Sequence, residues 1–147
     1  LLALILAGGL LGGAYISQYV FGLFPCEMCW WQRWPHFAAL GLVALAYFAP
    51  APRFWVALAA VAILTSGLLG GFHAGVEYKW WPGITGCAVV ELDMDVLNPN
   101  AAPLIRCDEA PWSLFGISLA GFNFLFSAIG AIAILGLIVG RQKRVSA

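Results

Sequence analysis

The sequence predicts an all-α membrane protein, a bundle of four transmembrane helices with two outward loops that carry cysteines. Three observations support this fold class. Hydrophobic residues make up 63% of the 147 positions and charged residues only 10%, whereas soluble proteins carry about 25% charged residues. The few charges are clustered and leave four long uncharged runs, and a bilayer core needs about 20 apolar residues per helix. All four cysteines lie outside these runs.

The runs define a single membrane domain and place its helices at about residues 1–22, 28–48, 54–73 and 113–139. A secretory signal peptide could mimic the first run, but this run has no basic start and continues too far. The chain begins without Met, so we expect that a native N-terminal tail precedes it. The second run is the shortest. The segment APAPR follows it, and its two prolines, Pro50 and Pro52, predict a tight turn because proline breaks helices.

The distribution of charge predicts the orientation of the helices. Arg53 lies between the second and third helices, and three basic residues follow the fourth, in neither place with an acidic residue nearby. The long connection from 74 to 112 instead carries six of the seven acidic residues. Basic residues mark the cytoplasmic side. We therefore expect both termini to be cytoplasmic and the loops at about 23–27 and 74–112 to face outward.

Two local patterns have competing interpretations. The stretch VVELDMDV alternates apolar and acidic residues, which is typical of an extended segment; it could pair with a partner protein or lie along the membrane surface. Small residues recur in the first, third and fourth runs, as in AGGLLGGA and SGLLGG. In lipid such residues let helix backbones approach closely, so we expect them to serve helix packing.

The four cysteines divide into two groups. Cys26 and Cys29 lie in the first outer segment, and Cys87 and Cys107 lie in the second. An outward, oxidising side favours disulfides, with three possible connectivities, and two inert staples are one alternative. A zinc site is disfavoured because only one pair is closely spaced. A Cys-x-x-Cys pair closes too short a loop to gain much stability, but it suits disulfide exchange because the second thiol stays beside the first.

Arg33 follows Cys29 by four residues. If a helix begins near Cys26, then Cys26, Cys29 and Arg33 share one helix face, and the helix N-terminus and the guanidinium both favour the reactive thiolate. An ionisable residue at a membrane boundary is a functional candidate. The alternative is an arginine whose side chain reaches out to the lipid headgroups.

Two histidines lie in the helices. His73, at the outer end of the third run, could carry a proton, bind a carbonyl group or simply face the interface, and Glu77 one turn later could hold its proton. His36 lies deeper in the second run, and we expect it to be structural. A quinone fits this set, because its carbonyl can accept from Arg33 and its ring can accept electron density from Cys29. The net charge of zero and the absence of an outward basic patch exclude nucleic-acid binding.

At these residues the sequence resembles the DsbB family of bacterial thiol oxidases of the inner membrane. The resemblance rests on PCEMCWWQR, HAGVEYKWWPGITGC and RCDEAPWSLFGISLAGFN, and it covers nearly the whole chain. It implies that a reduced DsbA-like thioredoxin-fold protein of the periplasm attacks a Cys87–Cys107 disulfide at Cys87. The Cys26–Cys29 disulfide then re-oxidises that pair, and Cys29 passes the electrons to ubiquinone or menaquinone.

The resemblance also implies roles for the neighbouring residues. Arg33 is expected to hold the quinone, and His73 falls near the family's histidine on the quinone side. The chemistry needs no metal. A protein similar to vitamin K epoxide reductase is the nearest rival enzyme, although there the active pair starts the last helix. A scaffold with two inert disulfides is the rival outside enzymes, and a transporter is disfavoured because few polar residues lie in the helices.

Overall fold

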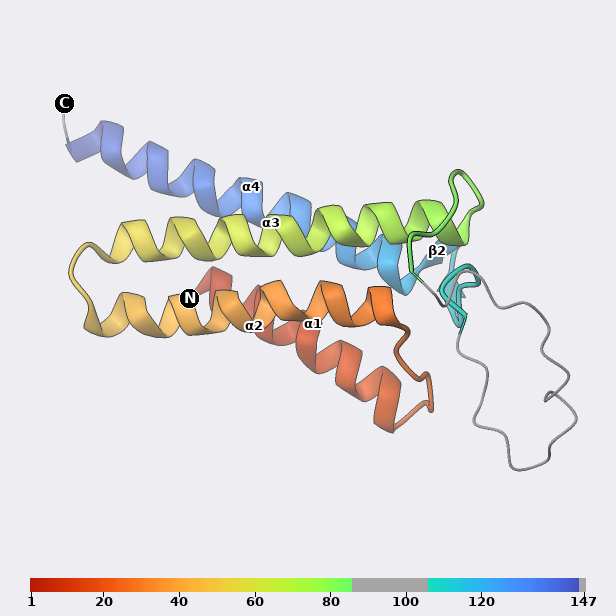
Figure 1. Cartoon of the computed structure of the whole chain (residues 1–147). Coiled ribbons are helices and arrows are strands. Elements are labelled where there is room, and N and C mark those ends of the chain that lie inside the picture. Colours follow the sequence, from red (N-terminus) through yellow and green to blue (C-terminus); the bar gives the residue numbers. More distant parts are fainter. Residues whose placement is uncertain (86–105, 146–147) are drawn as a thin grey trace, which may run out of the picture.

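The computed structural model describes residues 1–85 and 106–145. Four helices dominate this part of the chain: α1 (Leu2–Tyr19), α2 (Glu27–Phe48), α3 (Pro52–Glu77) and α4 (Leu119–Val145). Before α4, the two strands β1 (Ser113–Leu114) and β2 (Ile117–Ser118) pair as an antiparallel hairpin. α3 packs along both α2 and α4, and α1 crosses α2 and contacts the other two helices less extensively (Figure 1).

Three helices in the described part of the chain, α1, α3 and α4, are long and apolar enough to cross a membrane. The protein is therefore a helical membrane protein, as the composition predicted. α2 also has 22 residues, but its first half carries Gln32, Arg33 and His36, which lower its mean hydropathy. Helix length and hydropathy thus identify three membrane spans. They do not identify α2 as the fourth span that the sequence predicted.

Two helix boundaries differ from the sequence prediction. α3 continues to Glu77 instead of ending at 73, so Glu77 lies on the same helix as His73, one turn further on. α4 begins at Leu119 and not at 113, because the intervening residues form the β hairpin. At the turn of the hairpin, Phe115 and Gly116 have positive φ angles, which do not fit a right-handed α-helix. Tyr78 holds the hairpin against α3: its hydroxyl donates to the Gly116 carbonyl and accepts from the backbone N–H of Ser118.

The small residues of α3 bring helix backbones together, as predicted. A Cβ added at Gly67 would lie 2.9 Å from the Cβ of Ser127 on α4, and one at Gly70 would lie 2.8 Å from the Ala120 carbonyl oxygen. The glycines of α1 behave differently. Among them Gly9 and Gly13 have no atom within 4 Å of an added Cβ, so the packing role expected for the AGGLLGGA motif is wrong for its glycines, although its Ala7 is fully buried in the core.

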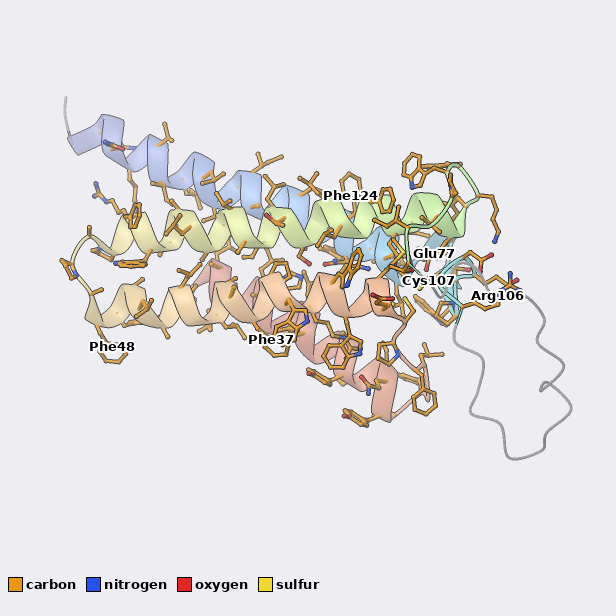
Figure 2. The ribbon with its side chains drawn as sticks, viewed as in Figure 1. Phe37, Phe48, Glu77, Arg106, Cys107 and Phe124 are labelled. Carbon is orange, nitrogen blue, oxygen red and sulfur yellow. The ribbon has the colours of Figure 1, made fainter. Side chains whose placement is uncertain are left out.

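The residues of the expected site gather at one end of the bundle. The N-terminus of α2, the C-terminus of α3 and the segment that leads into α4 meet there, opposite the α2–α3 turn (Figure 1). Glu77 and Cys107 lie at this end, and Arg106 lies just beyond them (Figure 2). The chain thus brings residues from three distant stretches of sequence into one place.

A candidate dithiol site between two cavities

The first element of the site is the Cys26–Cys29 pair at the start of α2. Cys26 is the N-cap residue of the helix, and its sulfur accepts the backbone N–H of Cys29 at 3.2 Å. The two sulfur atoms lie 2.8 Å apart and both thiols are free. The hydrogen bond to the Cys29 sulfur, together with burial, raises the pKa of Cys26. Cys26 therefore keeps its proton, and its S–H donates to the sulfur of Cys29.

His73 and Cys107 complete the centre of the site. His73 is 2% exposed, and its Nε2 lies 3.6 Å from the Cys26 sulfur, 3.1 Å from the Cys107 carbonyl oxygen and 3.8 Å from Glu77 Oε1. Burial rules out the interpretation of His73 as an exposed interfacial residue. Cys107 is fully buried and disulfide-bonded, and it packs in one apolar cluster with Cys26. Cys87 lies outside the described residues.

A chain of hydrogen-bonded amides runs from His73 into the bundle, and backbone carbonyls fix its direction. Gln32 Nε2 donates to the Met28 carbonyl at 3.2 Å, so the same nitrogen donates to His73 Nδ1 at 2.9 Å. Gln32 Oε1 accepts from Asn123 Nδ2 at 2.9 Å. Because Nδ1 of His73 accepts, its Nε2 carries the proton and donates to the Cys107 carbonyl.

This tautomer bears on whether the site could hold a metal. Cys26, Cys29 and His73 place three donor atoms within 4.8 Å of one another, and sulfur and imidazole are ligands that zinc prefers. However, a metal must bind an unprotonated ring nitrogen, and Nε2, the nitrogen that faces the sulfur, carries the proton. Metal binding would require the whole amide chain to reverse, so the geometry favours thiol chemistry over a metal centre.

Arg33 lies folded against α1 and does not reach out to the lipid headgroups. It is 6% exposed, and its guanidinium lies 4.9 Å from the ring centres of both Tyr15 and Trp30. It donates to Gln18 Oε1 at 2.7 Å and to the Ala14 carbonyl at 3.3 Å. In the described part of the chain no carboxylate lies within 4.0 Å of it. Its positive charge is therefore available to a ligand.

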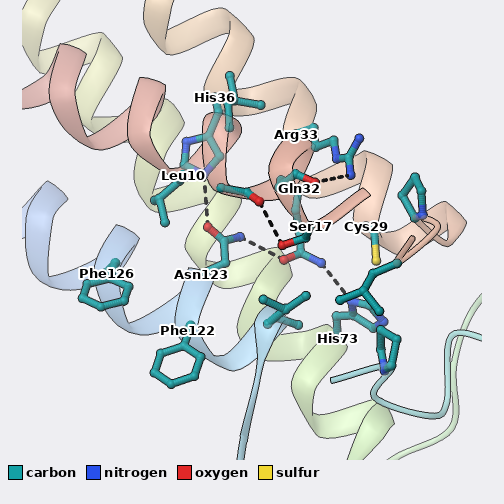
Figure 3. Close-up of a pocket in the computed structure, with 18 of the residues that line it drawn as sticks. Leu10, Ser17, Cys29, Gln32, Arg33, His36, His73, Phe122, Asn123 and Phe126 are labelled. Carbon is teal, nitrogen blue, oxygen red and sulfur yellow. Dashed lines mark hydrogen bonds between the residues drawn. The ribbon is translucent and has the colours of Figure 1, made fainter. Parts of the chain in front are cut away.

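Two cavities meet at the dithiol. The inner cavity, of about 250 Å³, lies among the helices; it has mostly apolar walls and includes Arg33, His36 and the glycines Gly9 and Gly13 of α1 (Figure 3). The outer cavity, of about 270 Å³, lies toward the loops and includes Cys26, Arg106 and Glu109. Cys29, His73 and Glu77 line both cavities, whereas Cys26 lines only the outer one.

Ion pairs hold the segment that leads from Cys107 toward α4. The Asp108 carboxylate accepts hydrogen bonds from Arg106 and from Lys79, which lies just past the end of α3. These hydrogen bonds hold the pKa of Asp108 well below its usual range, and the hydrogen bond from Arg106 has the largest effect. Lys79 also donates to the Asp108 backbone carbonyl. The segment that carries Cys107 is thus fastened to the end of α3.

The structure brings together most of the residues that the sequence singled out. Cys26, Cys29, Arg33 and His73 line the two cavities. Cys107 packs with Cys26 and Cys29, and its carbonyl is hydrogen-bonded to His73. Sequence reasoning missed the amide chain of Gln32 and Asn123, and it did not place His36 on the wall of a cavity. Polar residues inside apolar helices are expensive and commonly functional, which is the signal that would have identified them.

Fold and site together define a helical membrane protein with a redox-type dithiol, of which Cys26 is buried and Cys29 is half-buried. Residues 1–137 match the family described as "Disulfide bond formation protein DsbB". The chain is 33% identical to "Disulfide bond formation protein B" of Verminephrobacter eiseniae (strain EF01-2), covering 86% of this chain and 76% of that protein. It is 34% identical to "Disulfide bond formation protein B 2" of Pseudomonas syringae pv. syringae (strain B728a), covering 92% of this chain and 83% of that protein. No solved structure matches the chain.

The chain therefore belongs to the DsbB family of disulfide bond formation proteins and is a membrane thiol oxidoreductase. The sequence analysis left a protein similar to vitamin K epoxide reductase as the nearest rival enzyme. The family match decides in favour of the DsbB family. It also agrees with the apolar helices in placing the protein in a membrane.

Proposed function

We propose that the protein oxidises the dithiol of a periplasmic DsbA-like thioredoxin-fold protein and passes the electrons to a membrane quinone, either ubiquinone or menaquinone. The observation that carries this proposal is the position of Cys29. It lines both cavities, whereas Cys26 lines only the outer cavity and Arg33 only the inner one. A thiol on this boundary can take electrons from thiols in water and give them to an acceptor dissolved in lipid.

The inner cavity fits the head group of a quinone. It has a volume of about 250 Å³, mostly apolar walls and a guanidinium with no carboxylate partner in the described part of the chain. A quinone, when bound, supplies a two-electron acceptor whose oxygens take up two protons. Arg33 would donate a hydrogen bond to one of these oxygens and stabilise negative charge there. Cys29 would face the quinone as the thiol that gives up electrons, and His73 and Glu77 would lie at the same wall.

On the outer side, two disulfide exchanges supply the electrons. The partner's thiolate attacks a Cys87–Cys107 disulfide, and the partner leaves as a disulfide while Cys87 and Cys107 become thiols. In the second exchange the Cys26–Cys29 disulfide re-oxidises them and itself becomes two thiols. The burial of Cys107 beside Cys26 supports this order, as does the combination of a bonded Cys107 with two free thiols.

The last step returns the pair to its starting state. Cys26 and Cys29 lose two electrons and two protons as their disulfide forms again. The raised pKa of Cys26 makes Cys29 the sulfur that gives up electrons first, because Cys26 holds its proton and donates a hydrogen bond to Cys29. His73 lies beside Cys26, and it can take the second proton only if its neighbours reorient.

We further propose that α2 is the fourth membrane span and that the protein lies in the bacterial inner membrane with both termini in the cytoplasm. A helix of 22 residues is about 33 Å long, enough for a hydrocarbon core of about 30 Å. The polar residues of α2 face the inner cavity and the amide chain, where they are shielded from lipid. The two cysteine-bearing loops then lie on the periplasmic side.

A turnover assay tests the proposal. The protein in detergent is mixed with a reduced DsbA-type protein and a short-chain ubiquinone or menaquinone, and quinone absorbance is followed. We expect Cys29→Ala to abolish quinone reduction. We expect Arg33→Met to raise the quinone KM about 10- to 100-fold, since a hydrogen bond to a charged group contributes about 1.5–3 kcal/mol. Arg53→Met, in the first turn of α3, is the matched control and should leave the KM unchanged.

Two results would contradict the proposal. Equal KM values for the Arg33 and Arg53 variants would show that the quinone does not bind beside Arg33 in the inner cavity. No quinone reduction with any thiol partner would favour the scaffold with inert disulfides instead.

A further inference from the structure

His36 is a buried imidazole that none of these steps uses. It is 3% exposed, lies on α2 one turn after Arg33 and Gln32, and lines the inner cavity (Figure 3). Its Nε2 lies 3.0 Å from Asn123 Oδ1. Its Nδ1 has no hydrogen-bond partner anywhere in the described part of the chain. A buried polar atom without a partner is costly, so an unpartnered nitrogen on a side chain that lines a cavity points to a missing ligand group.

The amide of Asn123 determines which nitrogen of His36 carries the proton. Asn123 Nδ2 lies 3.2 Å from the backbone carbonyl oxygen of Ser66. A carbonyl oxygen can only accept, so this atom is the amide nitrogen and the amide cannot be turned round. Oδ1 must then accept from His36, and it also accepts from the Ser127 hydroxyl at 2.9 Å. In the neutral imidazole the proton therefore lies on Nε2, and Nδ1 keeps a lone pair that no described group satisfies.

We infer that His36 Nδ1 accepts a hydrogen bond from a hydroxyl group of the reduced, quinol form of the ligand. An oxidised quinone has only acceptor oxygens and offers nothing to this nitrogen, whereas a quinol has two hydroxyl donors. The inference rests on the proposed function and adds to it a binding residue that distinguishes the two redox forms. Asn123 is the positioning residue, because it fixes the tautomer of His36.

This preference has a consequence for the direction of electron flow. A site that binds the quinol more tightly than the quinone raises the midpoint potential of the bound couple. For a two-electron couple, a tenfold difference in affinity corresponds to about 30 mV. Binding at His36 therefore helps the bound acceptor to take electrons from the Cys26–Cys29 pair.

Nitrogen NMR of labelled histidine tests the inference without any turnover. The chain has only two histidines, so a spectrum of His36→Phe assigns both. We expect both rings to be neutral with the proton on Nε2. In Cys29→Ala protein, which cannot react, a short-chain ubiquinol should shift the Nδ1 resonance of His36 and leave that of His73 in place. The corresponding ubiquinone should shift neither.

Binding measurements provide the second readout. By tryptophan fluorescence quenching, His36→Phe should weaken ubiquinol binding about tenfold and change ubiquinone binding less than twofold. Ser127→Ala is the matched control, since it removes another hydrogen bond to Asn123 Oδ1 but lies outside the cavity. It should change neither affinity.

The outcomes separate this inference from the proposed function. If both redox forms bind the unmodified protein but the Nδ1 resonance does not move with ubiquinol, the inference is wrong and the proposed function stands. Equal weakening of both forms in His36→Phe leads to the same conclusion. If neither form binds the unmodified protein, the proposed function fails, and the inference fails with it.

Discussion

Replacing Gly70 by alanine tests whether the buried amides position the site. An added Cβ would lie 2.8 Å from the Ala120 carbonyl oxygen, 3.0 Å from Asn123 Nδ2 and 3.1 Å from Gln32 Oε1. A Cβ does not come so close to backbone, so α3 must shift or the amides must turn away. Overpacking of this kind costs about 1–3 kcal/mol, and alanine regains about 0.5–1 kcal/mol over glycine in a helix. We expect a net destabilisation of about 1–2 kcal/mol.

The same substitution should also impair the chemistry, because Gln32 and Asn123 fix the proton positions of both histidines. Thermal unfolding in detergent measures the loss of stability, and quinone reduction with a reduced DsbA-type protein measures the loss of activity. Gly12→Ala is the matched control: it makes the same change in α1, where an added Cβ meets nothing within 4 Å. If Gly70→Ala were as stable and as active as Gly12→Ala, the idea that the close approach of α3 positions the amides for stability and activity would be refuted.

Two further predictions concern the inner cavity and the outer segment. Gly13→Leu should fill the inner cavity and stop quinone reduction, while a stoichiometric burst still oxidises up to two partner dithiols per fully oxidised protein, one for each of its two disulfides. Gly8→Leu, outside the cavity walls, is the control, and an equal effect of both would refute the assignment. Because hydrogen bonds hold the pKa of Asp108 below its usual range, its carboxylate stabilises the fold above about pH 4, and this contribution is lost as the pH falls toward the folded-state pKa. The unfolding temperature of the protein should therefore drop more between pH 7 and pH 3 than that of Asp108→Asn, and parallel curves would contradict the prediction.

The sequence was sufficient to predict the helices and the reactive residues for simple physical reasons. Uncharged runs of about 20 residues have few alternatives to a membrane helix. The Cys-x-x-Cys spacing and the arginine one turn later fix their mutual placement, since residues three and four apart share a helix face. Cys26, Cys29 and Arg33 could thus be placed before any tertiary structure was known.

The parts that could not be predicted depend on contacts between helices. Gln32 and Asn123 are 91 positions apart, and neither residue alone indicates the other. The start of α4 was misplaced because the hairpin before it depends on Tyr78, which lies at the end of a different helix. The role of Gly9 and Gly13 was misread because a glycine that permits close packing and a glycine that leaves room for a ligand look alike in sequence.

The pattern of satisfied and unsatisfied polar atoms connects the fold to its function. Burying an amide or an imidazole among apolar helices is unfavourable unless its hydrogen bonds are made. Gln32 and Asn123 meet this requirement through partners on three helices. The exceptions in the described part of the chain are His36 Nδ1 and Glu77 Oε2, and both residues line the inner cavity. Within the residues that the structure describes, the buried side-chain polar atoms that lack a partner therefore belong only to residues that line this cavity, which is the site proposed for the quinol.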